Sequence, residues 1–537
     1  MALPILAFVL VYLTSLIALF ISSFWSVDPF TSEMTHVWNL DNYRELWHSS
    51  AYRTIAVRTI GIAAAVTIAD AILAFPLAYF MARIAGGRSR ALIFVAVLLP
   101  LWSSYLIRVY IWRLILAHDG VLNWTLGKAG LPAANIGYTN WAVWLIFTYM
   151  WLPFMILPVY AALERVPESF LEASRDLGAG AWITFRRVLL PLALPGLVAG
   201  SIFTFSLTLG DYITPLLAGG ASSQFIGNVV DDNINNQLTP FAAAFATVPL
   251  VVMGGVSPDR APAGRLRGAL MESRSTRIAL TVWSALVLLF LWVPLALIML
   301  YAFNKSSVES WPMPGFTTHW FHAAWTSEVR ESLWLSVRVG LTATAIALVL
   351  GSMAAFGVAR FRFFGRDTVS FLLVLPLALP GIVTGIALNS AFVVGNVALS
   401  TWTIVIGHAT FCVVIVFNNV LARLRRSSPS LIEASYDLGA DGWQTFRFVI
   451  WPVLSTALVA GGLLAFALSF DEVIVTTFTA GVQNTLPLLI LGYIRLGQQL
   501  PVVNVIAFAM ILLTAIPVLL AARLMRDTGV LRGGATH

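Results

Sequence analysis

Residues 172–191 read EASRDLGAGAWITFRRVLLP, and residues 433–452 repeat this stretch as EASYDLGADGWQTFRFVIWP. Glu, Ala, Ser, Asp, Leu, Gly, Trp, Thr, Phe, Arg, Val and Pro recur in register. A polar, arginine-bearing loop that occurs twice between long apolar runs indicates two copies of one membrane unit on one chain. The repeat therefore decides the expected architecture.

Each copy has the composition of a short helix, a turn and a second short helix. Gly178 and Gly439 are expected to end the first helix, because glycine readily adopts the left-handed conformation of a helix stop. Pro191 and Pro452 stand where the next apolar helix begins, a position that suits proline. One such loop could be an amphipathic connector on the lipid surface, but two near-identical copies favour a docking function.

These loops, with Glu-Ala, a central Gly and a closing Pro, resemble the EAA motif of ABC importer permeases. The resemblance covers both halves and implies the fold of a type I ABC importer permease, with a complete pair of permeases fused in one polypeptide. It also implies that a short coupling helix in each loop sits in a groove of a cytoplasmic ATPase. The implied docking residues are Glu172, Ala173, Asp176, Leu177, Gly178 and Ala179, and Glu433, Ala434, Asp437, Leu438, Gly439 and Ala440.

The composition agrees with a membrane protein. Of 537 residues, 59% are hydrophobic and 11% are charged, which is outside the range of soluble domains. The formal net charge of +7 comes mostly from arginines in short loops, which favours membrane topology over nucleic-acid binding. The single cysteine, Cys412, lies in an apolar run, so we expect a small buried side chain and neither a disulfide nor a metal site.

The apolar runs predict an all-α integral membrane protein with about twelve transmembrane helices in two homologous six-helix halves. The expected spans are 3–25, 54–82, 92–116, 141–163, 192–218 and 241–256 in the first half, and 278–303, 333–360, 368–394, 399–421, 453–480 and 501–525 in the second. The sixth is short for a crossing helix, so it either begins earlier, near Asn236, or crosses a thinned bilayer.

The repeat and the spans divide the chain into three parts. Residues 1–256 form the first permease half with its docking loop at 164–191, and residues 278–537 form the second half with its docking loop at 422–452. Residues 257–277, rich in Pro, Gly and Arg, read as a cytoplasmic linker. Arginines gather on the side of the docking loops and acids on the other side, so the positive-inside rule places both docking loops and both termini in the cytoplasm of a bacterial inner membrane.

Acidic residues within spans are costly and are therefore candidates for function. The fifth span of the first half contains LGDYITPLLAGG, with Asp211 and Tyr212, and the matching stretch SFDEVIVTTFTAG contains Asp471 and Glu472. These acids lie about twenty residues beyond each loop proline, roughly 30 Å along a helix and near the outer mouth. There they would attract cations. Alternatively they cap helices or pair with Arg108 or Arg113.

Aromatic residues supply the other half of a cation site. Trp102 and Tyr105 lie one turn apart in the third span, and ammonium groups bind well over such rings. For Tyr110 and Trp112, helix packing or an interfacial position is the favoured interpretation. Asp70 in the second span has either a structural or a pathway role.

The amino-acid sequence around these residues resembles that of the two permease subunits of spermidine/putrescine-type importers. The stretches LPLWSSYLIRVYIWRLILAHDGVLN and LGDYITPLLAGG resemble one subunit, and LPLALPGIVTGIALNSAF and LSFDEVIVTTFTAG resemble the other. The resemblance implies two copies of an ABC ATPase, a soluble or lipid-anchored substrate-binding protein, and membrane lipid as partners, with no nucleic acid. Lacking a Walker phosphate loop, the chain itself would hold no cofactor, and ATP and Mg would be bound by the ATPase.

Several alternatives remain open. Relatives of this kind also import opines, phosphonates, thiamine and ferric iron, so the fold alone does not define the substrate. An ion-coupled secondary transporter of two six-helix halves would have the same span count. An enzyme lacks support, since the chain has no HExxH, no GxSxG and no Cys–His pairing. We therefore expect no catalytic residue and no metal site.

Overall fold

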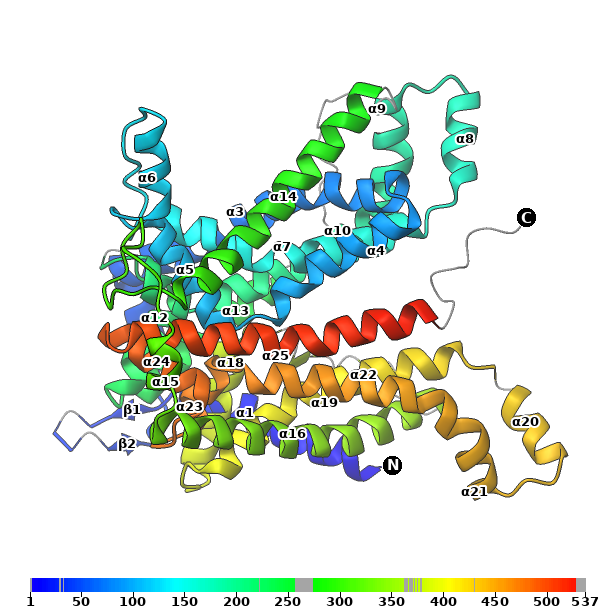
Figure 1. The fold of residues 1–537 in the computed structure, drawn as a ribbon. Helices are drawn as coiled ribbons and strands as arrows, with labels where there is room; N and C mark the ends of the chain where they lie inside the picture. Colours follow the sequence, from blue (N-terminus) through cyan, green and yellow to red (C-terminus); the bar gives the residue numbers. More distant parts are fainter. Residues whose placement is uncertain are drawn as a thin grey trace. The chain divides into compact units, whose positions relative to one another are not determined.

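The protein is almost entirely helical in a computed structural model (Figure 1). The structure describes residues 2–527 except 29, 32, 222, 256–273, 362–365, 367–369, 371, 374, 377, 378 and 429. Two short antiparallel strands, β1 (Ser26–Val27) and β2 (Met34–Thr35), are the exception among these residues, with Ser26 opposite Thr35. The predicted all-α class is confirmed.

The first half contains the following elements: α1 (Ala2–Ser22), α2 (Asp41–His48), α3 (Ser50–Tyr79), η1 (Phe80–Ile84), α4 (Gly87–Leu98), η2 (Leu99–Trp102), α5 (Tyr105–Leu116), α6 (Val121–Lys128), α7 (Asn140–Glu164), α8 (Glu168–Asp176), α9 (Ala181–Thr184), η3 (Phe185–Leu189), α10 (Leu190–Gly210), α11 (Ile213–Ala218), α12 (Ile226–Asn235) and α13 (Thr239–Gly255).

The second half contains the following elements: α14 (Arg274–Tyr301), α15 (His319–Ala323), α16 (Ser327–Arg360), α18 (Gly381–Val394), α19 (Thr401–Arg426), α20 (Ser430–Asp437), α21 (Gly442–Thr445), η5 (Phe446–Ile450), α22 (Trp451–Phe470), α23 (Ile474–Thr479), α24 (Leu486–Leu496) and α25 (Leu500–Asp527).

Each of the twelve predicted spans contains helix, but fewer are single long helices. Seven helices in the described part of the chain are long and apolar enough to cross a membrane, and α4 with α5 makes an eighth as a bent pair. Helices α13 and α18 are shorter, with 17 and 14 residues, whereas α1 and α25 have 21 and 28 residues, of which the side chains of 11–22 and 500–513 are described. The third predicted span is interrupted at Pro100 between α4 and α5, where proline lacks the backbone donor that continues a helix.

The sequence left the start of the sixth span either at residue 241 or earlier, near Asn236. Its helix α13 starts at Thr239, and Gln237 just before it has a positive φ of 63°, which separates it from α12. The helix thus begins before residue 241, near Asn236, and has 17 residues. Of the predicted linker, residues 257–273 lie outside the described part of the chain, and 274–277 belong to α14.

The helices form two compact units that do not coincide with the two sequence halves. Unit 1 comprises Met1–Tyr52, Val229–Leu250 and Thr326–Leu491, and unit 2 comprises Arg53–Asn228, Val251–Trp325 and Gly492–His537. The first span of the first half therefore belongs to unit 1 with the central spans of the second half. The first and last spans of the second half belong to unit 2.

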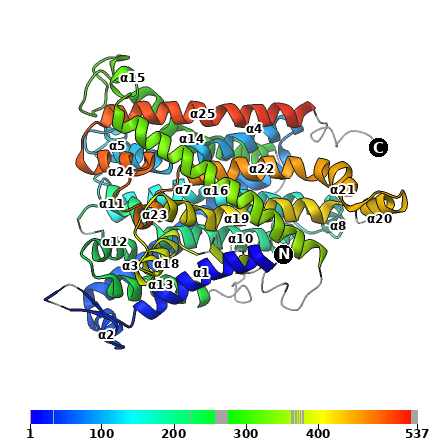
Figure 2. The same ribbon diagram turned by 90° about the horizontal axis from the view of Figure 1, so that it is seen from below.

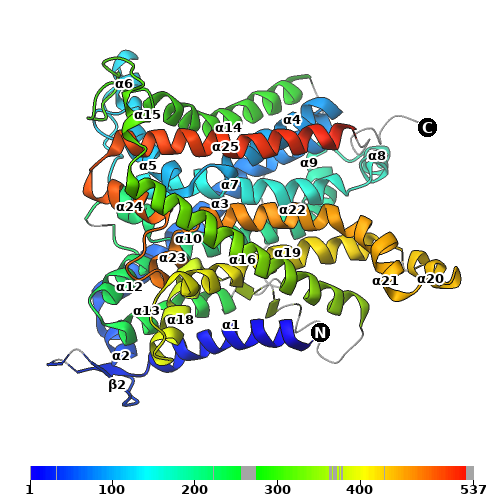
Figure 3. The same ribbon diagram turned by 60° about the horizontal axis from the view of Figure 1, so that its bottom comes forward.

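Unit 1 is built on α16, α19 and α22, which pack against one another, and α1 lies against α16 and α18 (Figure 3). Tyr12 of α1 is buried and its hydroxyl lies 3.4 Å from that of Thr384 in α18. Gly351 allows close approach of α16 to α19, because an added Cβ would lie 2.8 Å from the backbone oxygen of Val413. The core of this unit therefore draws on both sequence halves.

Unit 2 is built on α7 and α10, and α14 and α25 pack against each other and against α5 (Figure 2). The hydroxyl of Tyr149 in α7 donates to the Leu291 carbonyl oxygen in α14 at 3.3 Å. The Trp283 indole of α14 donates to the Leu73 oxygen of α3 at 3.2 Å. Helices α14, α15 and α25 of the second half thus complete a unit whose first-half helices include α7 and α10.

This exchange gives a prediction for the separated halves. Chains 1–256 and 278–537, produced together from separate genes, should co-purify from detergent through a tag on one of them, because each unit needs helices from both. Either chain produced alone should aggregate or be degraded, because α14 or α1 would lack its packing partners. A stable, monodisperse first half on its own would contradict the exchange.

Candidate functional site

The two repeated loops adopt the same local structure. In the first, α8 is followed by Gly178, α9 and the π-helical turn η3. In the second, α20 is followed by Gly439, α21 and the π-helical turn η5. Within unit 2, α8 and α9 lie at the end opposite α6, and within unit 1, α20 and α21 lie at the end opposite β1 and β2 (Figure 1).

The predicted glycine stops are confirmed. Gly178 and Gly439 have φ angles of +73° and +81°, the left-handed region that glycine enters without strain. The N–H groups of Ala179 and Ala440 bond back to the carbonyls of Ser174 and Ser435, at 3.0 Å in each loop, which closes the helix end. Nothing lies within 4 Å of a Cβ built on either glycine, so the backbone angle alone requires glycine here.

A hydroxyl pair joins the two short helices of each loop. The Ser174 and Thr184 hydroxyls are 2.8 Å apart in the first loop, and the Ser435 and Thr445 hydroxyls are 2.6 Å apart in the second. All four side chains are buried. Sequence reasoning gave these residues no role, although both recur in the repeat. The bridge holds the angle between the helices and so shapes the loop.

The predicted docking residues face outward from the loops. Glu172, Ala173, Asp176, Leu177 and Gly178 are exposed, as are their counterparts Glu433, Ala434, Asp437, Leu438 and Gly439, while Ala179 and Ala440 are half-buried. Leu177 and Leu438, at equivalent positions, are 87% and 88% exposed. Equally exposed leucines at the tips of two repeated loops are suited to the apolar pocket of a partner. That these residues contact an ATPase stays a prediction.

Each docking loop is continuous with a membrane helix. The N–H of Leu190 bonds to the Phe185 carbonyl, and that of Trp451 to the Phe446 carbonyl, so one wide turn leads into α10 or α22. Pro191 and Pro452 lie in the first turn of those helices, as predicted. The wide turn makes room for the proline ring, which would otherwise crowd the carbonyl four residues earlier. Each loop is therefore joined to its membrane helix by unbroken helical backbone.

The aromatic pair of the second loop is stacked. The rings of Trp443 and Phe446 are 5.7 Å apart with an interplanar angle of 26°, and Trp443 is 66% exposed. In the first loop, Phe185 packs edge-on against Phe75 of α3, and the side chain of Trp182 lies outside the described part of the chain.

Asp211 lies at the break between α10 and α11. Its Oδ1 accepts hydrogen bonds from the N–H groups of Ile213 and Thr214, at 2.9 and 3.0 Å. Its Oδ2 accepts from the Thr214 hydroxyl at 3.0 Å and from the Tyr105 hydroxyl of α5. Asp211, Tyr105 and Tyr212 are all buried. The carboxylate therefore caps a short helix and ties it to α5.

Glu472 occupies the equivalent break between α22 and α23. Its Oε1 accepts a hydrogen bond from the Val475 N–H at 2.9 Å, and the Thr476 hydroxyl donates to its backbone oxygen at 2.7 Å. Glu472 and the adjacent Asp471 are half-buried, whereas Asp211 is fully buried. The two breaks are capped alike, and Asp471 and Glu472 are less buried as whole residues than Asp211, although Oδ1 of Asp471 is itself buried.

The sequence left these acids either as an attraction for cations or as structural groups that cap helices or pair with arginine. The observed contacts of Asp211 and Glu472 are those of helix caps. Among the described contacts of Asp211 and Glu472, none is with Arg108 or Arg113. Arg113 instead donates to the Tyr138 hydroxyl at 2.9 Å. Capping does not exclude a place along a substrate pathway, which stays a prediction for Asp211, Tyr212, Asp471 and Glu472.

The aromatic residues of the third span are packed inside unit 2. Tyr105 stacks on Trp151 of α7 at 6.2 Å between ring centroids, and Trp112 contacts Tyr149 of α7 at 5.4 Å. Tyr110 is 1% exposed, which fits helix packing for this residue. The side chain of Trp102 lies outside the described part of the chain.

Other polar residues in the spans are buried. Neither carboxylate oxygen of Asp70 has a hydrogen-bond partner among the described residues. Arg58 of the same helix donates to the Gln224 carbonyl oxygen at 3.1 Å. Cys412 is buried, as expected. Within the described residues, no group of three His, Cys, Asp or Glu side chains could hold a metal ion.

Sequence reasoning missed Glu309, which lies between α14 and α15. Its two carboxylate oxygens accept hydrogen bonds from the Tyr110 hydroxyl of α5 and from the Asn504 amide of α25, the latter at 2.6 Å. Burial raises the pKa of the Glu309 carboxyl to about 7, against the lowering effect of the Asn504 hydrogen bond. No local pattern marks this contact, since its members come from three distant stretches of sequence.

The chain matches one protein family twice. The family described as "Binding-protein-dependent transport system inner membrane component" matches residues 74–257 and residues 347–529. Each match contains one of the two docking loops. The two permease units inferred from the repeat are therefore confirmed as two members of this family in one polypeptide.

Individual relatives match over most of their own length. The inner membrane ABC transporter permease protein YdcU of Escherichia coli (strain K12) is 47% identical over 266 residues, which are 47% of this chain and 84% of that protein. The spermidine/putrescine transport system permease protein PotB of the same strain is 34% identical over 223 residues, 41% of this chain and 80% of that protein. PotC of Haemophilus influenzae, a permease protein with the same description, is 31% identical over 240 residues, 44% of this chain and 92% of that protein.

A member of such a system is a transport component rather than an enzyme, and it works with an ATPase subunit and a substrate-binding protein. The apolar helices and the inner-membrane relatives make it a multi-pass inner-membrane protein. The chain belongs to the family of binding-protein-dependent transport system inner membrane components and carries two permease units fused in one polypeptide.

Proposed function

We propose that this chain is the permease of an ATP-driven importer for polyamines of the spermidine/putrescine type, or for related small organic cations. The observation that carries the ATP-driven part is the pair of docking loops, with equally exposed Leu177 and Leu438 and the same left-handed glycine turn. The substrate rests on relatives named as spermidine/putrescine permeases and on acids and aromatic residues near the helix breaks.

The two loops support a partner present in two copies, one seated on each loop. In this proposal ATP and Mg are bound by that ATPase, and this chain holds neither. Closure of the ATPase pair would move α8 and α20, and the continuous helices starting at Phe185 and Gly442 would carry the movement into the membrane. The arginine-rich loops support a cytoplasmic position for both docking loops and both termini.

The acids at the two breaks have different tasks in this proposal. The Asp211 carboxylate already accepts hydrogen bonds from the Tyr105 hydroxyl and from the first turn of α11, so in this proposal it maintains the geometry of the pathway. Asp471 and Glu472 are half-buried and carry two formal charges at adjacent positions, which suits the ammonium groups of a polyamine. Importers of opines, phosphonates, thiamine or ferric iron remain the alternatives for the substrate, whereas membership of a binding-protein-dependent family argues against an ion-coupled secondary transporter.

Replacing Gly178 and Gly439 together by valine should abolish transport while leaving membrane insertion intact. A branched side chain at these positive φ angles costs about 1–2 kcal/mol per site or more, so the turn that presents the docking helix would reshape. Uptake of labelled substrate into cells and the amount of membrane-inserted chain are the two measurements.

The matched control is Gly180→Val with Gly442→Val. These glycines lie in the same loops, also have nothing within 4 Å of an added Cβ, and are not in the left-handed region. We expect them to retain most of the uptake. Normal uptake by the Gly178/Gly439 variant would refute the coupling role, and equal loss in the control would assign the effect to side-chain bulk rather than to the turn.

Asp471→Asn with Glu472→Gln should lower spermidine uptake by about ten-fold, the effect expected when one hydrogen bond to a charged group is lost. Glutamine keeps an acceptor oxygen for the Val475 N–H, so the cap of α23 survives. Glu331→Gln, an exposed acid in α16, serves as the control. ATP-dependent uptake of labelled spermidine in proteoliposomes, with complex assembly followed in parallel, measures the effect.

Two results of this experiment would count against the proposal. Failure of the double variant to assemble would mean that the acids act only in structure. Absence of spermidine uptake by the unaltered complex, while another solute is imported, would reassign the substrate.

A further inference from the structure

Two outer segments of unit 2, residues 117–138 and 302–318, pack together at the end opposite α8 and α9, and we call them the outer cap. The backbone N–H of Trp311 donates to the Asp119 carbonyl oxygen at 3.3 Å. The rings of Trp124 and Trp311 meet edge-on, with 6.1 Å between their centroids. The cap therefore joins a loop of the first sequence half to a loop of the second.

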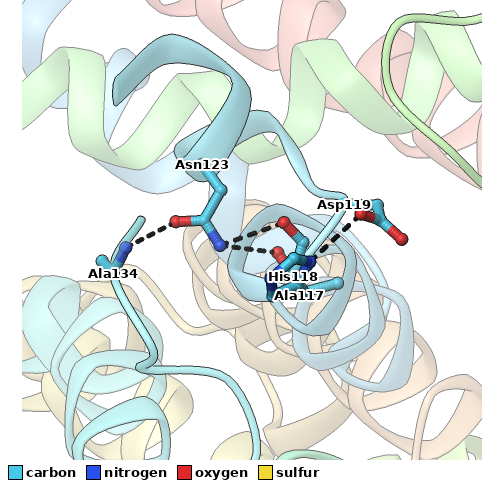
Figure 4. A network of polar contacts seen from close by, with 5 residues as sticks. All are labelled: Ala117, His118, Asp119, Asn123 and Ala134. Carbon is cyan, nitrogen blue, oxygen red and sulfur yellow. Dashed lines mark hydrogen bonds and ion pairs between the residues drawn. The ribbon is translucent and has the colours of Figure 1, made fainter. Parts of the chain in front are cut away.

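The side chain of Asn123 joins distant parts of the first segment (Figure 4). The Nδ2 of Asn123 donates to the carbonyls of Ala117 and His118, at 3.3 and 3.1 Å. Its Oδ1 accepts from the Ala134 N–H at 2.7 Å. One side chain therefore ties the start of this segment to residue 134 near its end.

The outer cap is attached to the spans below it through Glu309. One carboxylate oxygen accepts from Tyr110 of α5 and the other from Asn504 of α25. Tyr110 and Asn504 are each 1% exposed, so both contacts lie in the interior of unit 2. A carboxylate accepting two hydrogen bonds from two different helices is a strong, directional link.

The helix that Glu309 holds is also the helix that holds Asp211. Tyr105 and Tyr110 both belong to α5, which has only 12 residues and is separated from α4 by a break. A short helix bounded by a break moves as one body, so a displacement at Tyr110 is passed to Tyr105. From there the Tyr105–Asp211 hydrogen bond reaches the break between α10 and α11.

The polar groups around Glu309 are only partly satisfied. Within the described residues, Oδ1 of the buried Asn504 and the indole Nε1 of Trp311 have no hydrogen-bond partner. A partly satisfied buried network is costly, and a rearrangement that pairs these atoms would recover that cost.

The cap presents apolar side chains to a partner. Val308 and Phe316 are each 69% exposed and Leu131 is 54% exposed. They lie on the side of the membrane opposite the proposed ATPase side, where a substrate-binding protein would approach. Val308 directly precedes Glu309, so pressure on this surface acts at the attachment point.

We propose that Glu309 is a positioning residue that transmits the docking of the loaded binding protein on the outer cap to α5 and α25. This inference rests on the proposed function. It adds to that function the residue that links the binding protein on the outer cap to the helix break at Asp211. Release or rearrangement of the Glu309 contacts would let α5 shift and change the break at Asp211.

The test uses the complete complex of permease, ATPase and cognate binding protein in nanodiscs. We expect Glu309→Gln and Tyr110→Phe each to reduce the stimulation of ATPase activity by spermidine-loaded binding protein about ten-fold, as for loss of one hydrogen bond to a charged group. The basal ATPase activity and the affinity for the binding protein should be unchanged. The double variant should be no worse than the stronger single variant, because both remove the same contact.

Asp119→Asn is the matched control, since this acid lies on the same cap with a side chain that is 87% exposed and contacts only His118 among the described residues. It should leave the stimulation unchanged. Full stimulation in Glu309→Gln overturns the proposal. If Glu309→Gln fails to assemble, Tyr110→Phe decides, and normal stimulation in that variant overturns the proposal.

A second readout separates this inference from the substrate assignment. The rate of thiol modification of Val308→Cys should differ between the nucleotide-free and ATP-bound complexes, and Glu309→Gln should remove the difference. No stimulation of the unaltered complex by spermidine-loaded protein, with this difference intact, would mean that the substrate is wrong and the link is right. A difference that persists in Glu309→Gln would mean that the link is wrong.

Discussion

The need to satisfy every backbone polar group inside the membrane governs this structure. Long helices meet that need by themselves, and each place where a helix breaks needs a substitute partner. Asp211 and Glu472 supply it at the two equivalent breaks by accepting from the N–H groups that open α11 and α23. The same constraint explains the wide turns before Pro191 and Pro452, which keep the docking loops continuous with the membrane helices. The capped breaks and the continuous repeated loops are therefore both consequences of how the chain satisfies its helix ends.

The exchange of helices between the compact units explains how fusion of the two halves in one chain can help them assemble. Because α1 packs in unit 1 and α14 and α25 pack in unit 2, neither sequence half contains a complete set of packing partners. Linking the halves in one polypeptide keeps the exchanged helices at high effective concentration. It also means that a displacement of one docking loop acts on a unit to which both halves contribute.

Much of the architecture was predictable because it depends on local or repeated sequence. The duplicate loops, the glycine turns at Gly178 and Gly439 and the helical spans follow from composition and periodicity, and the structure and the family match confirm them. The exchange of spans was not predictable, since an apolar face does not specify which helix will cover it. The contact of Glu309 with Tyr110 and Asn504 left no local signal, because its members lie far apart in the sequence. For Asp211 the sequence left two alternatives, and only the observed hydrogen bonds favour capping.

The central claim is that each repeated loop seats one copy of the ATPase. The most direct measurement is thiol cross-linking of Leu177→Cys and Leu438→Cys to the ATPase in the assembled complex, one variant at a time and then together. The native Cys412 is buried, so the introduced thiols would be the reactive ones. The account predicts one ATPase cross-linked in each single variant and two in the double variant. A cross-link from only one loop, or from neither in a correctly assembled complex, would contradict it.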